Sequence, residues 1–408
     1  NCVYVPGWDC HGLPIEWKIE EKYRQKGKNK EDIPINQLRK DCREFAQDWI
    51  KLQKEEFKRL GVIGDWNNPY STMDFESEAV ISEEFLNLVN KGVVYRGSKP
   101  VMWSPVEKTA LAEAEIEYKN HRSSTIWVKF KIDKGDFRGD DIVIWTTTPW
   151  TIPSNKAVAY HSSIRYGLYE INEVEHECWV KVGDRIILAD NLSEETLKKS
   201  RVIKYNRVKS VESNVLNNLI LRHPFCGLSG ANGFWDYDVP LVEAEHVTDE
   251  TGTGFVHIAP SHGAEDFEVF LKRGWLSKMT DNVLDDSSFA DHVPFFKGQT
   301  IFDKKGKDGG ANRNVIDKLV EADRLIARGI LEHSYPHSWR SRAPVIFRNT
   351  PQWFVNIDRP LEDGLDDNGK SIRERALTSI DKLVKWVPKS GRNRLFNMVS
   401  SRPDWVLS

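Results

Sequence analysis

The sequence predicts a mixed α/β fold in which a helix-rich beginning gives way to a β-rich middle. Between residues 34 and 60 apolar residues recur at spacings of four and three, the period of one face of an amphipathic helix. From residue 124 onward short runs typical of strands follow one another closely, a pattern that favours a barrel or a sandwich. The chain has 408 residues, of which 39% are apolar, so it can bury two or three cores and we expect about two to three domains.

The elements follow from these periods and from their stop signals. Helices are expected over residues 34–60 and 82–91, which are followed by Gly61 and Gly92, and later over residues 264–273, 311–329 and 370–384. Strands are expected over residues 126–132, 141–144, 157–160, 178–182, 344–348 and 352–355. The stretch 303–312, rich in Lys, Gly and Asp, is expected to be a mobile loop.

Charge and cysteine content narrow the classes of function. The 58 Lys and Arg nearly balance the 61 Asp and Glu, which excludes a global basic field that would by itself indicate nucleic-acid binding. Five cysteines without a C-x-x-C pair argue against a disulfide framework and a zinc knuckle, so we expect reduced thiols in the cytoplasm. No run reaches the roughly eighteen apolar residues of a membrane helix, and no membrane partner is expected.

The most informative string is Trp145–Ile152, which places Thr146, Thr147 and Thr148 between two indoles directly after an apolar run. A strand that only needed burial would hardly end in three threonines and a proline, since proline cannot donate to a strand ladder. A polar turn at a strand edge is the simpler interpretation. A binding or catalytic site is the other.

A second string, Pro6–Glu16, places Asp9 and His11 between glycines just ahead of a helical pattern. Glycines let a ligand approach the backbone closely, and a carboxylate held there could accept charge-assisted hydrogen bonds from an ammonium group. The alternative is structural: the Asp caps the helix and the His packs against Trp8.

The string Pro6–Glu16 closely resembles isoleucyl-tRNA synthetases, class I enzymes whose nucleotide-binding core is interrupted by an editing insertion. The resemblance runs along the chain through Gly64–Trp66, Thr72–Asp74, Ala112–Tyr118, the threonine string, Gly252–Asp266, Ser334–His337, Thr350–Phe354 and Arg402–Trp405. It implies an incomplete Rossmann-like α/β core, residues 1–120 and 334–408. Between these parts it implies a β-barrel-like (α+β) editing domain, residues 121–333.

The resemblance also implies roles for single residues of the core. Asp9 would bind the α-ammonium of the amino acid, with His11 among the substrate-binding residues. Trp353 and Trp405 would flank the aliphatic side chain, and burying that side chain between two indoles is favourable by roughly 0.8 kcal/mol per methylene. Ordinary core packing is the alternative for both tryptophans.

In the editing domain the resemblance implies that Thr146, Thr147 and Thr148 hold the terminal ribose and the ester. Asp266 would hold the substrate ammonium, and His257 would tighten the pocket so that valine fits and isoleucine does not. The family enzyme uses ATP and Mg²⁺ to join isoleucine to the 3′ end of its tRNA, and it hydrolyses mischarged valyl-tRNA. We expect a cytoplasmic monomer, and no general base can be assigned.

Three other interpretations stay open. His257, His262 and Asp266 have spacings of five and four that a metal could use, although the glycine and proline around them speak against one rigid helix face. A valyl- or leucyl-tRNA synthetase shares the layout. A non-catalytic module that binds tRNA or an aminoacyl ester would hold the same ligand without turnover.

The chain departs from the family in two places. Many members carry a zinc knuckle, with a C-x-x-C pair after the Trp at position 103 and another cysteine before the Trp at position 339; here these places contain Ser104, Glu107 and Ser338, so no zinc is expected. The two ATP-binding signatures are expected upstream of Asn1 and downstream of Ser408. This chain is therefore expected to perform editing but not ATP-dependent activation.

Overall fold

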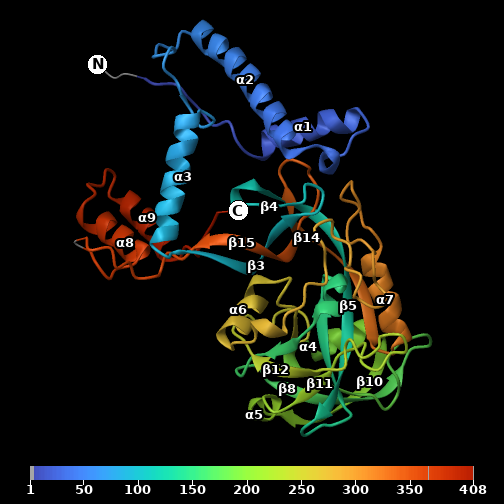
Figure 1. Cartoon of the computed structure of the whole chain (residues 1–408). Coiled ribbons are helices and arrows are strands. Elements are labelled where there is room, and N and C mark those ends of the chain that lie inside the picture. Colours follow the sequence, from blue (N-terminus) through green and yellow to red (C-terminus); the bar gives the residue numbers. More distant parts are fainter. Residues whose placement is uncertain (1–3, 366, 408) are drawn as a thin grey trace. The chain divides into compact units, whose positions relative to one another are not determined.

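The structure, a computed structural model, describes residues 4–365 and 367–407, so Cys2 lies outside the described residues. It divides the chain into two compact units (Figure 1): unit 1 comprises residues 1–97 and 352–408, and unit 2 comprises residues 98–351. Within the described ranges, no helix is both long enough and apolar enough to cross a membrane.

Unit 1 is mainly helical. Its helices are α1 (Leu13–Gln25), α2 (Ile35–Arg59), α3 (Phe75–Asn90), α8 (Ile372–Lys382) and α9 (Ser390–Ser400). The short strand β1 (Gly7–Trp8) pairs in parallel with β2 (Tyr70–Ser71). The strand β15 (Ile346–Val355) begins in unit 2, and its last residues, in unit 1, pair antiparallel with β16 (Trp405–Val406).

Most predicted helices are confirmed in this unit. The predicted helices 34–60 and 370–384 correspond to α2 and α8. The predicted helix 82–91 is part of α3, which begins earlier, at Phe75. Glu76 and Glu78 in its first turn favour this earlier start, because acidic side chains stabilise the positive end of the helix dipole.

Unit 2 is built on a ten-stranded mixed sheet with the order β10-β8-β9-β6-β5-β11-β12-β7-β13, and β14 also pairs with β5. The strands are β5 (Ile116–Lys134), β6 (Asp141–Thr146), β7 (Ala157–Tyr160), β8 (Tyr166–Val174), β9 (Arg185–Ala189), β10 (Val202–Val211), β11 (Ile220–Arg222), β12 (Asp238–Glu243), β13 (Val256–Ile258) and β14 (Leu325–Ser338). No pairing among the described residues joins β10 to β13. The sheet is therefore open, and the predicted barrel-like form is not confirmed.

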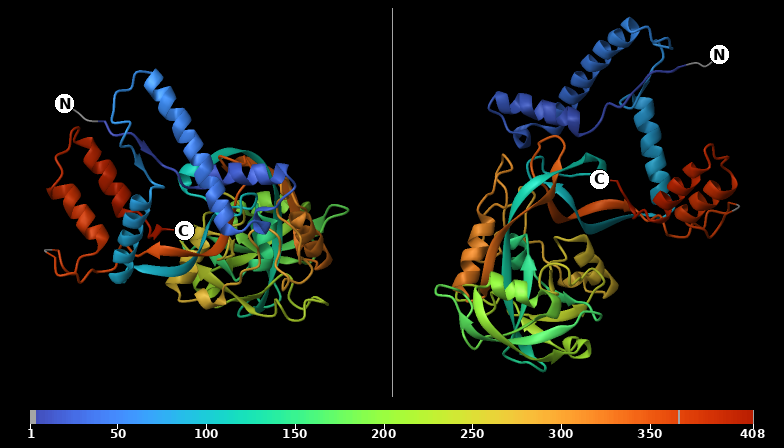
Figure 2. Two further views of the ribbon diagram at one scale, coloured as in Figure 1. Left: turned by 45° about the horizontal axis from the view of Figure 1, so that its top comes forward. Right: turned by 180° about the vertical axis from the view of Figure 1, so that it is seen from behind.

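Four helices and one short hairpin complete unit 2. The helices are α4 (Asp190–Lys199), α5 (Ser213–Leu216), α6 (Ala264–Lys272) and α7 (Ala311–Glu321), and β3 (Val94–Ser104) forms the hairpin with β4 (Thr109–Ala110). Figure 2 shows the long strands β5 and β14 side by side, with α7 against them.

The pairing of β6 with β5 fixes the position of the threonine string. β6 pairs antiparallel with β5, and Ile126 faces Thr146 where β6 ends. Ile142 and Ile144 are fully buried in the largest core cluster of the unit, while Val143 enters a second cluster on the opposite face. Because both faces of β6 are buried, its register is fixed, and the threonines after it have a defined position.

The remaining predictions on elements are mixed. The strands predicted at 126–132, 141–144 and 157–160 and the helix at 264–273 are confirmed by β5, β6, β7 and α6. The predicted helix 311–329 ends at Glu321, after which β14 begins, and the two predicted strands 344–348 and 352–355 form the single strand β15.

The strand predicted at 178–182 is wrong. These residues form the turn between β8 and β9, where Gly183 adopts a φ of 91° that other residues rarely adopt. The apolar pattern arose because Val180 points into the core, only 2% exposed. An apolar side chain on a packed turn gives the same local signal as a strand.

Candidate functional site

The second half of the threonine string is a buried 3-10 helix, η3 (Pro149–Ser154). Its carbonyl groups are satisfied by side chains from distant parts of the chain. His223 Nε2 donates to the Ile152 carbonyl (3.0 Å), and Trp235 Nε1 donates to the Pro153 carbonyl (3.0 Å). These contacts hold the segment rigidly, since a buried backbone carbonyl without a partner would be costly.

The threonine hydroxyls form a connected chain. Thr146 Oγ1 lies 3.2 Å from Thr148 Oγ1, which lies 3.4 Å from Thr151 Oγ1. The Thr151 hydroxyl donates to the Thr148 carbonyl (2.8 Å), and its oxygen lies 2.9 Å from His257 Nε2. Because the Thr151 proton is used toward the carbonyl, the Thr151 oxygen accepts from His257 Nε2–H.

His257 is held as a neutral ring. It lies on β13, where it faces Val158 of β7. Burial and, to a lesser extent, the neighbouring His262 lower the pKa of His257 to about 4. Its Nδ1 faces the Asn155 amide nitrogen at 3.4 Å, so Nδ1 is the acceptor and Nε2 carries the proton. With both nitrogens engaged and the pKa low, His257 positions Thr151 and is a poor general base.

A pocket of about 80 Å³ opens beside the string. Its lining combines string residues with polar and aromatic side chains of β5, β14, the loop before α7 and the start of α7: Thr147, Thr148, Trp150, His121, Arg122, Ser123, Ser124, Phe302, Asp308, Asn312 and Tyr335. The Trp150 backbone N–H donates to Asn312 Oδ1 (3.1 Å), which links α7 to the string. A space of this size admits a few water molecules or a small polar group.

Asp266 lies in the first turn of α6. Its Oδ2 accepts from the Ala259 backbone N–H (2.8 Å), and its Oδ1 lies 3.9 Å from His246 Nε2. Burial raises the pKa of Asp266 to about 7, and the Ala259 hydrogen bond only partly opposes this shift. No hydrogen bond among the described residues joins Asp266 to the three threonines, although all four residues belong to unit 2.

His262 is a structural lock beside the string. Its Nδ1 donates to the Phe347 carbonyl (3.0 Å), its Nε2 lies 3.1 Å from Ser154 Oγ, and its ring packs edge-on against Trp150. Hydrogen bonds therefore occupy both ring nitrogens of His262, as they do in His257. The interpretation of these histidines as metal ligands therefore fails, because their ring nitrogens already have protein partners and a ligating nitrogen must be free of them.

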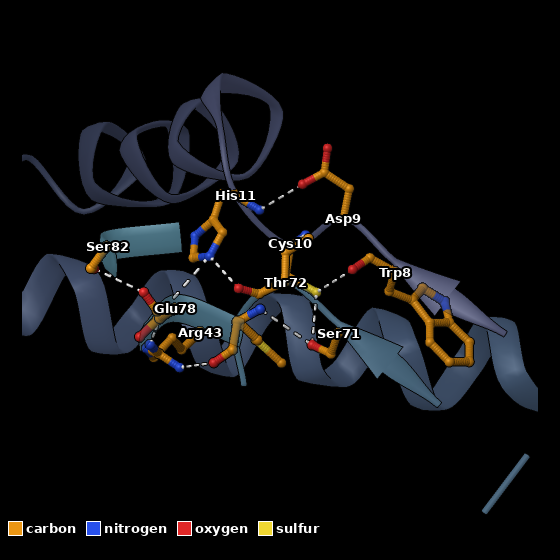
Figure 3. A network of polar contacts seen from close by, with 10 residues as sticks. Trp8, Asp9, Cys10, His11, Arg43, Ser71, Thr72, Glu78 and Ser82 are labelled. Atoms are coloured by element: carbon orange, nitrogen blue, oxygen red, sulfur yellow. Dashed lines mark hydrogen bonds and ion pairs between the residues drawn. The ribbon is translucent and has the colours of Figure 1, made fainter. Parts of the chain in front are cut away.

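In unit 1 the two residues of the first string face different ways (Figure 3). The Asp9 carboxylate is exposed and receives one long contact, 3.4 Å, from the His11 backbone N–H. The His11 ring turns toward the end of β2, where Nε2 donates to the Thr72 carbonyl (3.0 Å) and lies 3.7 Å from Glu78 Oε1. The structure thus leaves Asp9 open to a ligand, while His11 fastens the loop.

The two tryptophans expected at the amino-acid side chain lie together. Val355 of β15 faces Trp405 of β16, and the Leu407 N–H donates to the Trp353 carbonyl (2.8 Å). In this register Trp353 and Trp405 are diagonal neighbours on one face of the strand pair. They are 46% and 51% exposed, so neither is an ordinary core residue.

Sequence reasoning missed one member of the hydroxyl chain and several residues that line the pocket. Thr151 belongs to the threonine string, and its position one helical turn after Thr148 was the available signal. Asp308 and Asn312 lie in the stretch 303–312, which the sequence predicts to be a mobile loop because it is rich in Lys, Gly and Asp. His121 and Tyr335 come from β5 and β14, and nothing in the local sequence indicates that these strands meet.

The chain is similar to known proteins along its whole length. A sequence model of the family described as tRNA synthetases class I (I, L, M and V) matches residues 1–408. A curated protein of Ruegeria pomeroyi named isoleucine–tRNA ligase is 58% identical over 409 residues, which cover 99% of this chain and 42% of that protein. A protein of the same name from Rhodopseudomonas palustris is 50% identical, over 99% of this chain and 41% of that protein.

The chain thus spans less than half the length of these relatives. A solved structure described as GlLeuRS-CP1 is 12% identical, with a TM-score of 0.34, and covers 51% of this chain and 99% of that chain.

Proposed function

Since this chain belongs to the family of class I tRNA synthetases (I, L, M and V), we propose that unit 2 hydrolyses the ester of a mischarged tRNA. The substrate is valine attached to the 3′ end of isoleucine tRNA, and the domain responsible comprises residues 121–333. The observation that carries this proposal is the chain of threonine hydroxyls, in which Thr148 joins the buried Thr146 and Thr151 to a pocket that Thr147 also lines.

A physical limit explains why such a site is needed. One missing methylene in an apolar pocket is worth only about 1–3 kcal/mol, a limit for which isoleucine and valine are the reference example. An isoleucine site must therefore admit some valine. A second site that accepts only the smaller side chain removes the product of that error.

In the proposed reaction Thr147 and Thr148 hold the terminal ribose and the ester in the pocket, and Thr146 fixes Thr148. Asp266 receives the substrate ammonium, because a carboxylate with one unsatisfied oxygen gains a strong charge-assisted contact there. A positioned water attacks the ester with help from the free ribose hydroxyl. His257 supplies no base and keeps Thr151 in place.

For the longer protein we propose the activity in the name of its relatives, the ATP-dependent joining of isoleucine to its tRNA. Asp9 would bind the amino-acid ammonium, and Trp353 with Trp405 would flank its side chain. ATP and Mg²⁺ would supply the activated phosphate chemistry of that reaction. A cytoplasmic location fits the four described cysteines, which are free thiols.

The test is deacylation of isoleucine tRNA charged with valine or with isoleucine. The chain should release valine selectively, and Asp266→Ala should lower that rate about 100-fold, since a charge-assisted contact to the substrate is lost. Asp48→Ala, which removes an exposed carboxylate on α2, is the matched control and should keep the full rate.

Other outcomes separate the rival functions. Release of threonine esters with valyl esters spared would indicate a valyl-type enzyme, and release of norvaline would indicate a leucyl-type one. Binding of the charged tRNA without turnover would indicate a non-catalytic module. A rate that Asp266→Ala leaves unchanged would refute the role of this carboxylate.

A further inference from the structure

Two turns of unit 2 have the same form. Ser104–Glu107 begins at the last residue of β3, and Ser338–Ser341 begins at the last residue of β14. Each turn carries a polar side chain at its first and fourth positions. Each is followed by a non-glycine residue in the left-handed region, Lys108 with φ 52° and Arg342 with φ 61°. Paired residues at this spacing, from two separate turns, are the arrangement of a four-ligand zinc site.

The two turns meet at the carboxylate of Glu107. The Ser338 hydroxyl donates to it, with distances of 2.8 Å to Oε1 and 3.0 Å to Oε2, and the Ser341 backbone N–H donates to Oε1 (2.9 Å). Ser104 Oγ accepts from the Glu107 backbone N–H (3.3 Å). Ser104, Glu107 and Ser338 are 1%, 7% and 0% exposed, so this cluster is shielded from solvent.

The residues present do not fit the zinc knuckle that the family resemblance implies. A structural zinc ion takes thiolate or imidazole ligands, and three of these four positions are serine. The fourth is the carboxylate, and both of its oxygens already accept hydrogen bonds from the opposite turn. The donor set is that of a hydrogen-bonded anion rather than that of a bound cation.

We propose that the Glu107 carboxylate replaces the metal ion as the link between these two turns. A metal joins the turns by four bonds to one central cation. Here one buried anion accepts hydrogen bonds from the facing turn, and such charge-assisted bonds are about twice as strong as neutral ones. The link ties the β3–β4 hairpin to the end of β14 without any metal.

The first experiment measures thermal unfolding of the full chain. Glu107→Gln keeps the shape but removes the charge, and it should lower the unfolding midpoint by about 3–8 °C. Glu113→Gln, at an exposed position close by, is the matched control and should shift the midpoint by less than about 1 °C. A chelator should leave the midpoint of the unaltered chain unchanged. A chelator-sensitive midpoint, or equal midpoints for the two variants, would overturn the proposal.

The second experiment tests whether the first and fourth positions of the two turns face one common centre, and it does not depend on the Glu107 side chain. The variant Ser104→Cys, Glu107→Cys, Ser338→Cys, Ser341→Cys should bind one equivalent of Co²⁺ with the intense absorption of tetrahedral thiolate coordination, and Zn²⁺ should displace it. The unaltered chain, which has other cysteines, is the control and should not develop this spectrum. An octahedral spectrum or no binding in the four-cysteine variant would show that the turns do not share a centre.

Discussion

The threonine string of unit 2 and the Asp9 loop of unit 1 are both polar segments at the end of a strand, yet they are held very differently. The string is buried, and side chains from several distant segments satisfy its backbone. The Asp9 carboxylate is exposed and has a single long contact. A rigid, desolvated group is suited to orienting a reacting ester, whereas an open carboxylate is suited to capturing a soluble ammonium group.

The largest expected difference between the units concerns their tryptophans. Trp235 is fully buried and donates to the Pro153 carbonyl, so Trp235→Ala should destabilise unit 2 by about 3–5 kcal/mol in urea unfolding. Trp405→Ala, at a half-exposed position, should cost less than about 1 kcal/mol. Equal losses would show that the two sites are not held differently.

The second prediction concerns the loss of stability caused by burying the Asp266 carboxylate. Burial raises its pKa from 3.8 to about 7, so the folded chain binds this proton more tightly and loses stability as pH rises from about 4 to about 7. Asp266→Asn should therefore stabilise the chain at pH 8 by about 1–3 kcal/mol. This gain is smaller than the full pKa shift would give, because the side chain is still 17% exposed and water screens its charge. Urea unfolding at pH 8 and pH 4 measures this gain, which should vanish at pH 4. The same gain at both pH values would contradict the assignment.

The elements of the fold and the residues of the site differ in how far the sequence could predict them. The helices α2 and α8 and the strands β6 and β7 follow from local periodicity, because each buries one face or both. The string was singled out because three hydroxyls and a proline stand where a core segment would not place them, whereas Asp266 was implied by the family resemblance alone. The pocket itself could not be predicted, since His121, Tyr335 and Asn312 meet the string only through long-range pairing of β5, β14 and α7.

A third, smaller effect is expected at Thr151. Thr151→Val keeps the shape of the side chain but leaves His257 Nε2–H without an acceptor, which should cost about 1–3 kcal/mol of stability and slow deacylation. Thr251→Val, at an exposed turn, is the matched control. If both variants unfold alike, the hydroxyl chain does not organise the site.

The smallest effect on stability is expected at Asp9. Asp9→Asn should change the free energy of unfolding by less than about 0.5 kcal/mol, because the side chain is exposed and weakly bonded. Isoleucine binding, measured by calorimetry on the longer protein, should nevertheless weaken by about tenfold or more. Deacylation by unit 2 should be unchanged, and a parallel loss there would mean that the two sites are not independent.

The most direct test of the account is the ratio of hydrolysis rates for valyl and isoleucyl esters of isoleucine tRNA, measured with this chain alone. The proposed exclusion of the larger side chain from the pocket beside Thr147 and Thr148 predicts rapid release of valine, with isoleucine released at least about tenfold more slowly. Equal rates for the two esters, or no release of valine, would contradict it.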